Sequence, residues 1–256
     1  MQEIIKKQSK MGKISFYTLV TRFSEYTEMV ESAKSIGFQT CNFFYFDNKK
    51  SNDFDGFSGL NYALKHCTSD YMIFCHQDII FNFDTKNILI DKINELEQLD
   101  PNWAIIGNAG VTEKGEVILK ITDPHGPNQT KGPFPSQVMS VDENFMVINT
   151  KHNLSCSTQM KGFHLYGLDL CQNAANLGLK SYVVDFHLTH KSKGNIDHSF
   201  FTARDNYIKI QEERKRIQFF FTTCTKFLVS NTKLFNVLLN NKVALKLLSI
   251  LLKFKR

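Results

Sequence analysis

Asp78 is the first residue whose position suggests chemistry, because it closely follows an apolar run at residues 71–75, with only His76 and Gln77 between. A carboxylate and a neutral imidazole can together hold Mg²⁺ or Mn²⁺ and leave the other positions to water and phosphate oxygens. A cation held there would neutralise a diphosphate. Asp78 could instead be a turn or capping residue, so the spacing indicates a candidate metal site.

Other polar residues also follow apolar runs: Thr21 and Arg22, Asp47 and Asn48, and the segment 108–110. In open parallel sheets, ligands bind beyond the carboxyl ends of the strands. Neither GxGxxG nor GxxxxGK[ST] occurs at a strand end, so the usual glycine-rich phosphate loops are missing. A diphosphate would therefore need another partner, and a cation held by carboxylates is the obvious one.

Strands and helices alternate in the first half of the chain. The apolar runs typical of strands occupy residues 13–20, 39–46, 71–75 and 103–107. Between them, apolar residues recur at helical spacing from Tyr26 to Ile36, on one face through Phe57 and Leu60, and from the cap Thr85 through residue 99. This alternation predicts a mostly parallel, doubly wound sheet.

The second half begins with a different pattern. Residues 111–121 predict a hairpin that turns at Lys114 and Gly115, and residues 121–137 predict a long, lid-like loop. Residues 138–149 predict one continuous strand with Asp142 and Glu143 in its middle, where they could face either a donor sugar or solvent. A helix over 164–178 and a strand over 180–186 complete the expected core.

The residues from Asn61 to Phe81, which include the His-Gln-Asp run, resemble the core of the inverting glycosyltransferases of family 2. The motifs IIGNAG, VDENFMVI, FHLYGLDLC and HKSKG follow in consistent order, as in a subgroup found in bacterial surface-polysaccharide loci. The resemblance covers about residues 13–195. It implies a GT-A-like α/β domain over 11–197, with a mostly parallel sheet flanked by helices, and a helical C-terminal extension over 198–256.

The resemblance also implies roles for particular residues. Asp78 and His190 would bind the cation, and Asp169 would be the catalytic base. The resemblance also gives donor binding to Asp47, Asn48 and Asn61. From position alone, Thr21 is a further candidate for donor binding, His76 and Gln77 could line the donor site or shape the loop, and His164 and Tyr166 could contact the acceptor or pack. Two departures from the family pattern stand out: His76 replaces the usual first acid of the metal motif, and Leu168 replaces the acid that commonly precedes the base.

The implied activity is inverting, metal-dependent transfer of a sugar, with Mg²⁺ or Mn²⁺ as the cofactor. The donor would be a nucleotide-diphosphate sugar, with a UDP-sugar favoured, and the acceptor a glycan or a lipid-linked glycan in surface-polysaccharide biosynthesis. A sugar-phosphate nucleotidyltransferase would share the fold and the metal, but its glycine-rich opening loop is absent here. A noncatalytic module that binds membrane or nucleic acid is the other alternative.

The positive charge is concentrated at the C-terminus. Residues 200–256 contain 12 Lys and Arg and 3 Asp and Glu, a net +9, whereas residues 1–199 contain 19 and 22, a net −3. The segment 226–256 mixes Lys with apolar residues and predicts an amphipathic helix, which would lie on an anionic membrane surface or pack on the body. No nucleic-acid recognition motif accompanies the charge.

The six cysteines form no CxxC pair, the N-terminus is polar, and no run approaches the roughly 18 apolar residues that a spanning helix requires. These features predict a cytoplasmic protein, at most peripheral on the inner face of the cell membrane.

Overall fold

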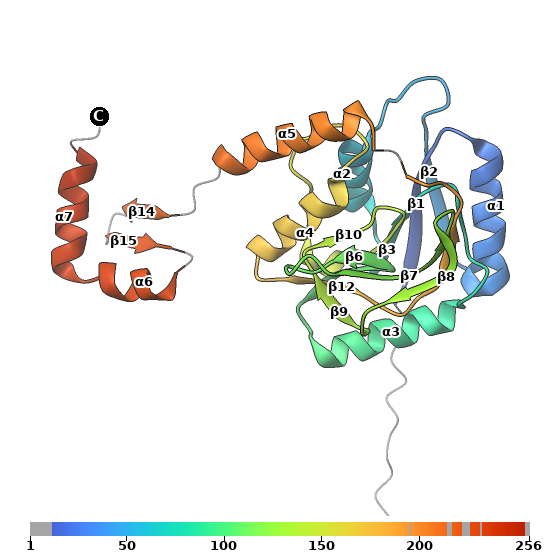
Figure 1. The fold of residues 1–256 in the computed structure, drawn as a ribbon, viewed down its shortest axis with the longest axis horizontal. Coiled ribbons are helices and arrows are strands. Elements are labelled where there is room, and N and C mark those ends of the chain that lie inside the picture. The colour runs from blue at the N-terminus through green and yellow to red at the C-terminus, as the bar shows by residue number, and fades with distance from the viewer. Residues whose placement is uncertain (1–11, 195, 214–216, 222–225, 231, 254–256) are drawn as a thin grey trace, which may run out of the picture. The chain divides into compact units, whose positions relative to one another are not determined.

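A seven-stranded sheet forms the centre of the larger of the chain's two compact units (Figure 1). The computed structural model describes residues 12–194, 196–213, 217–221, 226–230 and 232–253. The strand order is β2 (Asn42–Asp47), β1 (Ile14–Val20), β3 (Tyr71–Cys75), β11 (Phe145–Asn149), β5 (Trp103–Gly107), β12 (Lys180–Val183) and β9 (Ser136–Val138). The central strands are buried on both faces, which explains their nearly continuous apolar sequences.

The sheet is mixed, although the alternation of strands and helices predicted mostly parallel pairing. β1 runs parallel to β2 and β3, and β12 runs parallel to β5. β11 lies between β3 and β5 and is antiparallel to both, and β9 is antiparallel to β12. A buried strand has an apolar sequence in either direction, so the pattern of residues could not predict the reversal of β11.

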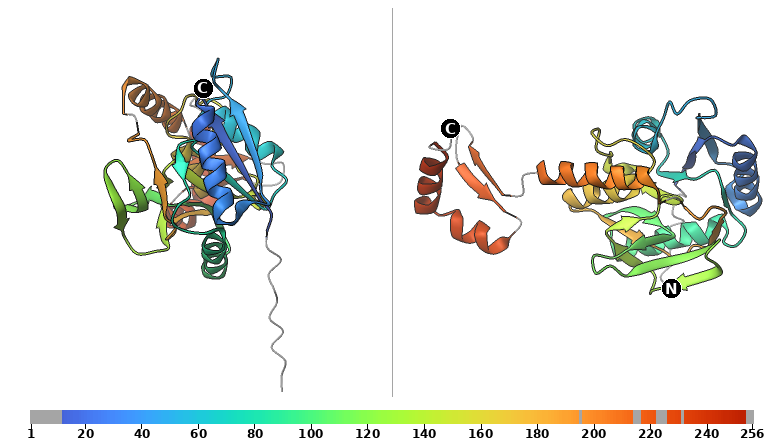
Figure 2. Two further views of the ribbon diagram at one scale, coloured as in Figure 1. Left: turned by 90° about the vertical axis from the view of Figure 1, so that its right-hand side faces the viewer. Right: turned by 45° about the horizontal axis from the view of Figure 1, so that its top comes forward.

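Helices cover both faces of this sheet (Figure 2). On one face, α1 (Phe23–Ala33) and α3 (Lys86–Leu99) bury Met29 and Leu89 in the same apolar cluster as Phe16 and Ile73. On the other face lie α2 (Gly56–His66) and α4 (Tyr166–Asn176), where the ring of Tyr166 contacts those of Phe57 and Phe74. Successive side chains of β3 therefore serve opposite layers.

Two helix ends illustrate local control by sequence. Asp55 begins α2 with a reciprocal capping box, in which its side chain accepts the Ser58 backbone N–H. Thr85 occupies the N-cap position of α3, as predicted, but its side chain makes no capping hydrogen bond. The α1 helix continues into a π-helical turn, η1 (Lys34–Phe38), which contains Gly37 at a φ of 117°, a value that favours glycine.

A second, smaller sheet covers the carboxyl end of the first. Its order is β10 (Ser140–Val141), β6 (Ala109–Val111), β7 (Val117–Asp123), β13 (Leu188–His190) and β4 (Ile79–Ile80). A further strand outside this order, β8 (Gly126–Lys131), also pairs with β7. The predicted turn at Lys114 and Gly115 joins β6 to β7. β4 begins directly after Asp78, and β13 ends at His190, so this sheet brings two distant candidate ligands together.

Two expectations for this region are wrong. Residues 121–137 are not a lid-like loop: they include the end of β7, the strand β8 paired with β7, and the start of β9, which pairs with β12. β8 is an edge strand with exposed polar residues, so its sequence lacks the alternation of apolar and polar residues that predicts a strand. The run 138–149 is not one strand: Val138 ends β9, and β10 and β11 follow. The chain turns between β10 and β11, where Asp142 accepts a hydrogen bond from the Asn144 backbone N–H. Asp142 and Glu143 therefore lie in a turn.

The chain divides between Arg204 and Asp205, inside α5 (His198–Glu213), into two compact units. The predicted boundary lay between residues 197 and 198. The second unit contains an antiparallel hairpin, β14 (Gln218–Phe221) and β15 (Lys226–Val229), followed by α6 (Lys233–Leu239) and α7 (Lys242–Lys253). The expected continuous helix from residue 226 is therefore wrong for 226–229. Residues 254–256 of that expected helix lie outside the described residues.

Candidate metal centre and active site

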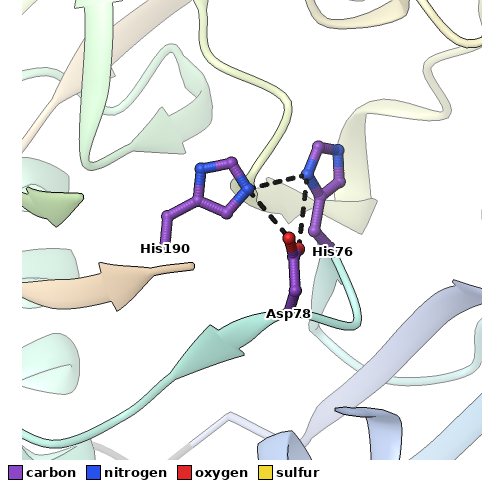
Figure 3. Close-up of side chains that lie close together, drawn as sticks. All are labelled: His76, Asp78 and His190. Carbon is purple, nitrogen blue, oxygen red and sulfur yellow. Dashed lines mark hydrogen bonds and ion pairs between the residues drawn. The ribbon is translucent and has the colours of Figure 1, made fainter. Parts of the chain in front are cut away.

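Three side chains converge at the junction of the two sheets: His76, Asp78 and His190 (Figure 3). The first two lie in the turn between β3 and β4, and His190 is brought to them because β13 pairs with β4. His190 Nε2 lies 3.4 Å from Asp78 Oδ1 and 3.4 Å from His76 Nδ1, and His76 Nδ1 lies 4.0 Å from Asp78 Oδ1. All three candidate ligand atoms lie within 4.8 Å of one another.

The charges of this cluster are strongly coupled. Burial acts to raise the pKa of Asp78, but the hydrogen bond and charge of His190 outweigh it and hold the pKa well below its usual range. Burial acts to lower the pKa of His190, but Asp78 outweighs it and raises the pKa. Burial and the neighbouring His190 lower the pKa of His76. The carboxylate is therefore kept ionised, and His76 is kept neutral.

Surrounding groups hold these three side chains in place. His76 Nε2 lies 3.1 Å from the Tyr166 hydroxyl, and His190 Nε2 lies 3.1 Å from Ser192 Oγ. The backbone N–H of His76 donates to the Asn144 carbonyl at 2.9 Å. The bond to Tyr166 engages one ring nitrogen of His76 and leaves the other, Nδ1, directed at the cluster.

The donor set fits a divalent cation. It offers two ring nitrogens and one ionised carboxylate oxygen, which leaves positions for water and substrate oxygens. Two imidazole nitrogens favour a transition cation such as Mn²⁺ over Mg²⁺, which prefers oxygen ligands. His76 thus belongs to the candidate ligand cluster, whereas the sequence analysis considers it for donor binding.

A cavity of about 820 Å³ opens beside the cluster, within the size range of small-molecule sites. Its walls include the three candidate ligands, the ends of β1 and β2 at Thr21 and Asn48, and the turn 142–144. The buried side-chain oxygen of Asn144, Oδ1, has no hydrogen-bond partner among the described residues. The walls therefore combine apolar surface with polar groups that can orient a ligand.

The predicted donor-binding residues divide into two groups. Thr21, Asn48, His76 and Gln77 line the cavity. Gln77 Oε1 accepts the backbone N–H groups of Thr21 and Arg22, both at 2.9 Å, so its amide fixes the end of β1. Asn48 donates to the Phe54 carbonyl at 2.6 Å and holds the following loop.

Asp47 and Asn61 are not among the residues that line the cavity. Asp47 Oδ1 accepts the Lys49 backbone N–H at 3.0 Å in the turn after β2. Asn61 makes two hydrogen bonds to the backbone of Cys156, as donor to its carbonyl at 3.2 Å and as acceptor from its N–H at 2.7 Å. These contacts give Asn61 a role in joining α2 to the segment before α4.

His164 and Tyr166, predicted to contact the acceptor, both line the cavity. His164 Nε2 lies 2.9 Å from Ser199 Oγ, and its ring packs edge-on against Phe200. Tyr166 is the first residue of α4 and directs its hydroxyl at His76. Tyr166 therefore connects the helix to the ligand cluster.

Asp169, the predicted base, lies away from the cavity walls and is fully buried. Its Oδ2 accepts the Ser157 backbone N–H at 2.6 Å and the Asn173 side-chain amide at 3.2 Å, and its Oδ1 accepts from Ser157 Oγ at 2.7 Å. Since neutral donors occupy both carboxylate oxygens, Asp169 is placed to hold the segment before α4 rather than to reach a ligand in the cavity.

Glu143 and its neighbour Asp142 both line the cavity, and Glu143 is the one that bonds to the start of α4. Its Oε1 accepts the backbone N–H of Gly167 at 3.1 Å. Burial and the neighbouring Asp142 raise the pKa of Glu143 to about 8, although the backbone N–H groups at the start of α4 act to lower it. Asp142 is exposed, and its Oδ1 accepts from the backbone and side chain of Asn144.

Gly167 is the residue in the sequence that allows Glu143 to lie so close to the start of α4. A Cβ at this position would lie 3.0 Å from Glu143 Cγ and 2.7 Å from the Val141 carbonyl oxygen, so a larger residue would displace Glu143. The sequence leaves the side chains of Asp142 and Glu143 equally plausible for the cavity or for solvent. The contact with Gly167 is what distinguishes Glu143.

Solved structures of similar architecture show which fold this chain has. A mannosyltransferase from Pyrobaculum calidifontis, in complex with GDP-Man and Mn²⁺, superposes with a TM-score of 0.52 at 9% identity, over 81% of this chain and 66% of that chain. GalNAc-T7 with UDP, GalNAc and Mn²⁺ superposes with a TM-score of 0.55 at 9% identity, over 80% and 48%. The chain thus spans about two thirds and about half of these proteins, and its fold is the GT-A-like α/β fold, as the sequence predicted.

Comparison of the sequence with those of known proteins identifies a relative. The protein named ATP synthase subunits region ORF 6, from Fuscovulum blasticum, is 34% identical over 201 residues, which cover 74% of this chain and 80% of the relative. The chain belongs to the same family as this protein. No protein-family model matches the chain.

Proposed function

We propose that this protein transfers a sugar from a nucleotide-diphosphate donor to an acceptor hydroxyl, in the presence of a divalent cation. The observation that carries the proposal is the cluster of His76, Asp78 and His190 on the wall of an 820 Å³ cavity in a GT-A-like fold. Without a glycine-rich phosphate loop, a diphosphate bound there needs a cation to offset its charge.

His76, Asp78 and His190 would hold the cation, with Mn²⁺ favoured and Mg²⁺ as the alternative. When bound, the cation neutralises the charge that develops on a departing diphosphate. The two similar structures described above are complexes that contain Mn²⁺, which supports this choice. The ionised Asp78 and the neutral His76 are the forms that bind a cation.

We assign the base to Glu143 in place of Asp169. The acceptor oxygen attacks the anomeric carbon, the bond from that carbon to the diphosphate oxygen breaks, and the acceptor proton passes to the Glu143 carboxylate. A base works best when its pKa lies near the operating pH, and the pKa of Glu143 is about 8. A single displacement of this kind inverts the anomeric configuration.

The remaining walls suggest where the substrates bind. The ends of β1 and β2, with Thr21 and Asn48, would face the nucleotide, for which a UDP-sugar is the proposed donor. His164 and Tyr166 would face the acceptor, proposed to be a glycan or a lipid-linked glycan in surface-polysaccharide biosynthesis on the cytoplasmic side of the membrane.

A thermal-shift panel tests the proposal. The purified chain is titrated with nucleoside diphosphates and nucleotide sugars, with Mn²⁺ or with EDTA, alongside Asp78→Asn and the control Asp47→Asn, which alters a carboxylate outside the cavity walls. A nucleotide sugar should raise Tm only with Mn²⁺, in the wild type and in Asp47→Asn. Equal shifts with EDTA would contradict the proposal. Formation of pyrophosphate from a nucleoside triphosphate and a sugar phosphate would favour a nucleotidyltransferase.

A further inference from the structure

Polar contacts join the elements of the second unit. Asn240 bonds both backbone groups of Leu228, accepting the N–H at 2.8 Å and donating to the carbonyl at 2.8 Å, and so joins the end of α6 to β15. Lys226 Nζ donates to Ser249 Oγ at 3.0 Å and joins β15 to α7. These contacts show which sides of α6 and α7 face the hairpin of the second unit.

The outward sides of both helices are apolar. The large apolar residues exposed on them are Leu234, Phe235, Val237 and Leu238 of α6, and Val243, Leu247, Ile250 and Leu251 of α7. The four in α7 have the spacing of a single helical face. In α3 of the first unit, the comparable residues Leu89, Ile93 and Leu96 are buried, whereas Val243 is 70% exposed. Within the second unit, the apolar face of α7 therefore has no cover like that of α3 within the first.

The charge around this surface has one sign. Residues 214–256 contain ten Lys and Arg and no Asp or Glu. Three of the described lysines, Lys233, Lys242 and Lys246, are exposed on α6 and α7. An apolar face bordered only by cations matches an anionic lipid surface, which offers acyl chains and phosphates together. Nucleic acid would match the cations but not the exposed leucines.

Both helices of this surface are short: α6 has 7 residues and α7 has 12. No single described helix is both long and apolar enough to span one; α6 and the part of α7 up to Leu251 pass that test only together, and they are bent by 92° at their junction. We propose that α6 and α7 dock on an anionic membrane surface, with their apolar faces at the level of the headgroups and their lysines at the lipid phosphates. This inference does not depend on the proposed sugar transfer.

Flotation of the full chain with vesicles tests the docking. Vesicles of phosphatidylglycerol and phosphatidylcholine are compared with vesicles of phosphatidylcholine alone. The variants are Leu247→Glu with Leu251→Glu, and Lys233→Gln with Lys242→Gln and Lys246→Gln. The matched controls, on exposed residues of the first unit, are Leu99→Glu with Leu177→Glu, and Lys65→Gln with Lys114→Gln and Lys161→Gln. Circular dichroism verifies that each variant is folded.

We expect the wild type and both controls to float with anionic vesicles and not with neutral ones. Each Lys near an anionic surface contributes roughly a fivefold gain in partitioning, so the triple Lys variant should bind about 100-fold more weakly. The double Leu variant should lose at least about tenfold. Binding should fall with added salt.

Several outcomes would overturn the docking: no flotation of the wild type, equal losses in variants and controls, or resistance to an alkaline carbonate wash, which would indicate insertion. Sedimentation that shows a wild-type dimer, lost in Leu247→Glu with Leu251→Glu, together with no flotation, would assign the face to a second copy. Binding of a single-stranded RNA without flotation would assign the charge to nucleic acid.

Discussion

Asp78 and Asp169 are both buried carboxylates, but their surroundings differ in kind. Asp169 accepts hydrogen bonds from Ser157 and Asn173, neutral donors that occupy its oxygens. Asp78 faces His76 and His190, whose ring nitrogens change protonation and bind cations. The type of neighbour, more than burial, therefore separates a carboxylate that holds the fold from one that can bind a cation.

The largest expected effect follows from loss of the ionised carboxylate. Asp78→Asn keeps the size of the side chain but weakens the cation site, so transfer should fall by about 10³-fold or more, since cation stabilisation of a leaving group is worth several kcal/mol. Turnover of a nucleotide sugar with Mn²⁺ measures this loss, and Mn²⁺ titration should show weaker binding. Wild-type turnover that continues in EDTA would mean that transfer needs no cation, and Asp78 would then have no role that Asp169 lacks.

The next effect concerns the base. Glu143→Gln cannot accept a proton, so kcat should fall by roughly 10²- to 10⁴-fold while donor binding changes little. Asp142→Asn is the matched control, because it changes the neighbouring carboxylate of the same turn. A larger loss in Asp142→Asn than in Glu143→Gln would move the base to Asp142.

The raised pKa of Glu143 gives a pH dependence with a definite sign. If ionised Glu143 is the base, kcat/KM should rise about tenfold per pH unit below its pKa and level off above about pH 8. Glu143→Gln should flatten this rise. A pH profile of wild-type kcat/KM that falls between pH 6 and pH 8 would contradict the assignment.

The same pKa predicts an effect on stability. Because the folded pKa, about 8, lies above the ordinary value of 4.5, ionisation of Glu143 disfavours the folded state. Its stabilising contribution is complete below pH 4.5 and is lost as the pH rises to about 8. Urea unfolding should therefore show Glu143→Gln gaining stability relative to the wild type between pH 5 and pH 9. A constant difference across this range would mean that Glu143 titrates normally.

The smallest effect on catalysis should come from Asp169. In Asp169→Asn, one amide N–H would face a donor of Ser157 or Asn173, at a cost of about 1–3 kcal/mol in the free energy of unfolding. The kcat of the folded protein should stay within about twofold of the wild type. A 100-fold lower kcat with unchanged stability would return the role of base to Asp169.

The sequence indicates candidate ligands where side chains that can bind a cation lie at or just after the end of a strand. Asp78 and His190 were singled out as metal ligands, and the structure brings them together across β4 and β13. His76 was given another role, because the direction of its ring depends on Tyr166, which is remote in sequence. The motif favours Asp169 as the base, but its carboxylate accepts hydrogen bonds from Ser157, which lies in a segment with no signal of its own. Three-dimensional neighbours, which spacing cannot show, account for these differences.

The pairing of β13 with β4 sets both where His190 lies in the candidate cation site and the direction in which its side chain points. Side chains of a strand alternate between its two faces, and His190 points at Asp78 because it lies opposite Ile79 in this ladder. A slip of this ladder by one residue would turn His190 to the other face of the sheet, and a slip by two would restore its face but move it about 7 Å along the strand. The register of β13 against β4 is therefore part of the candidate site, and Mn²⁺ affinity should depend on it as well as on the ligands themselves.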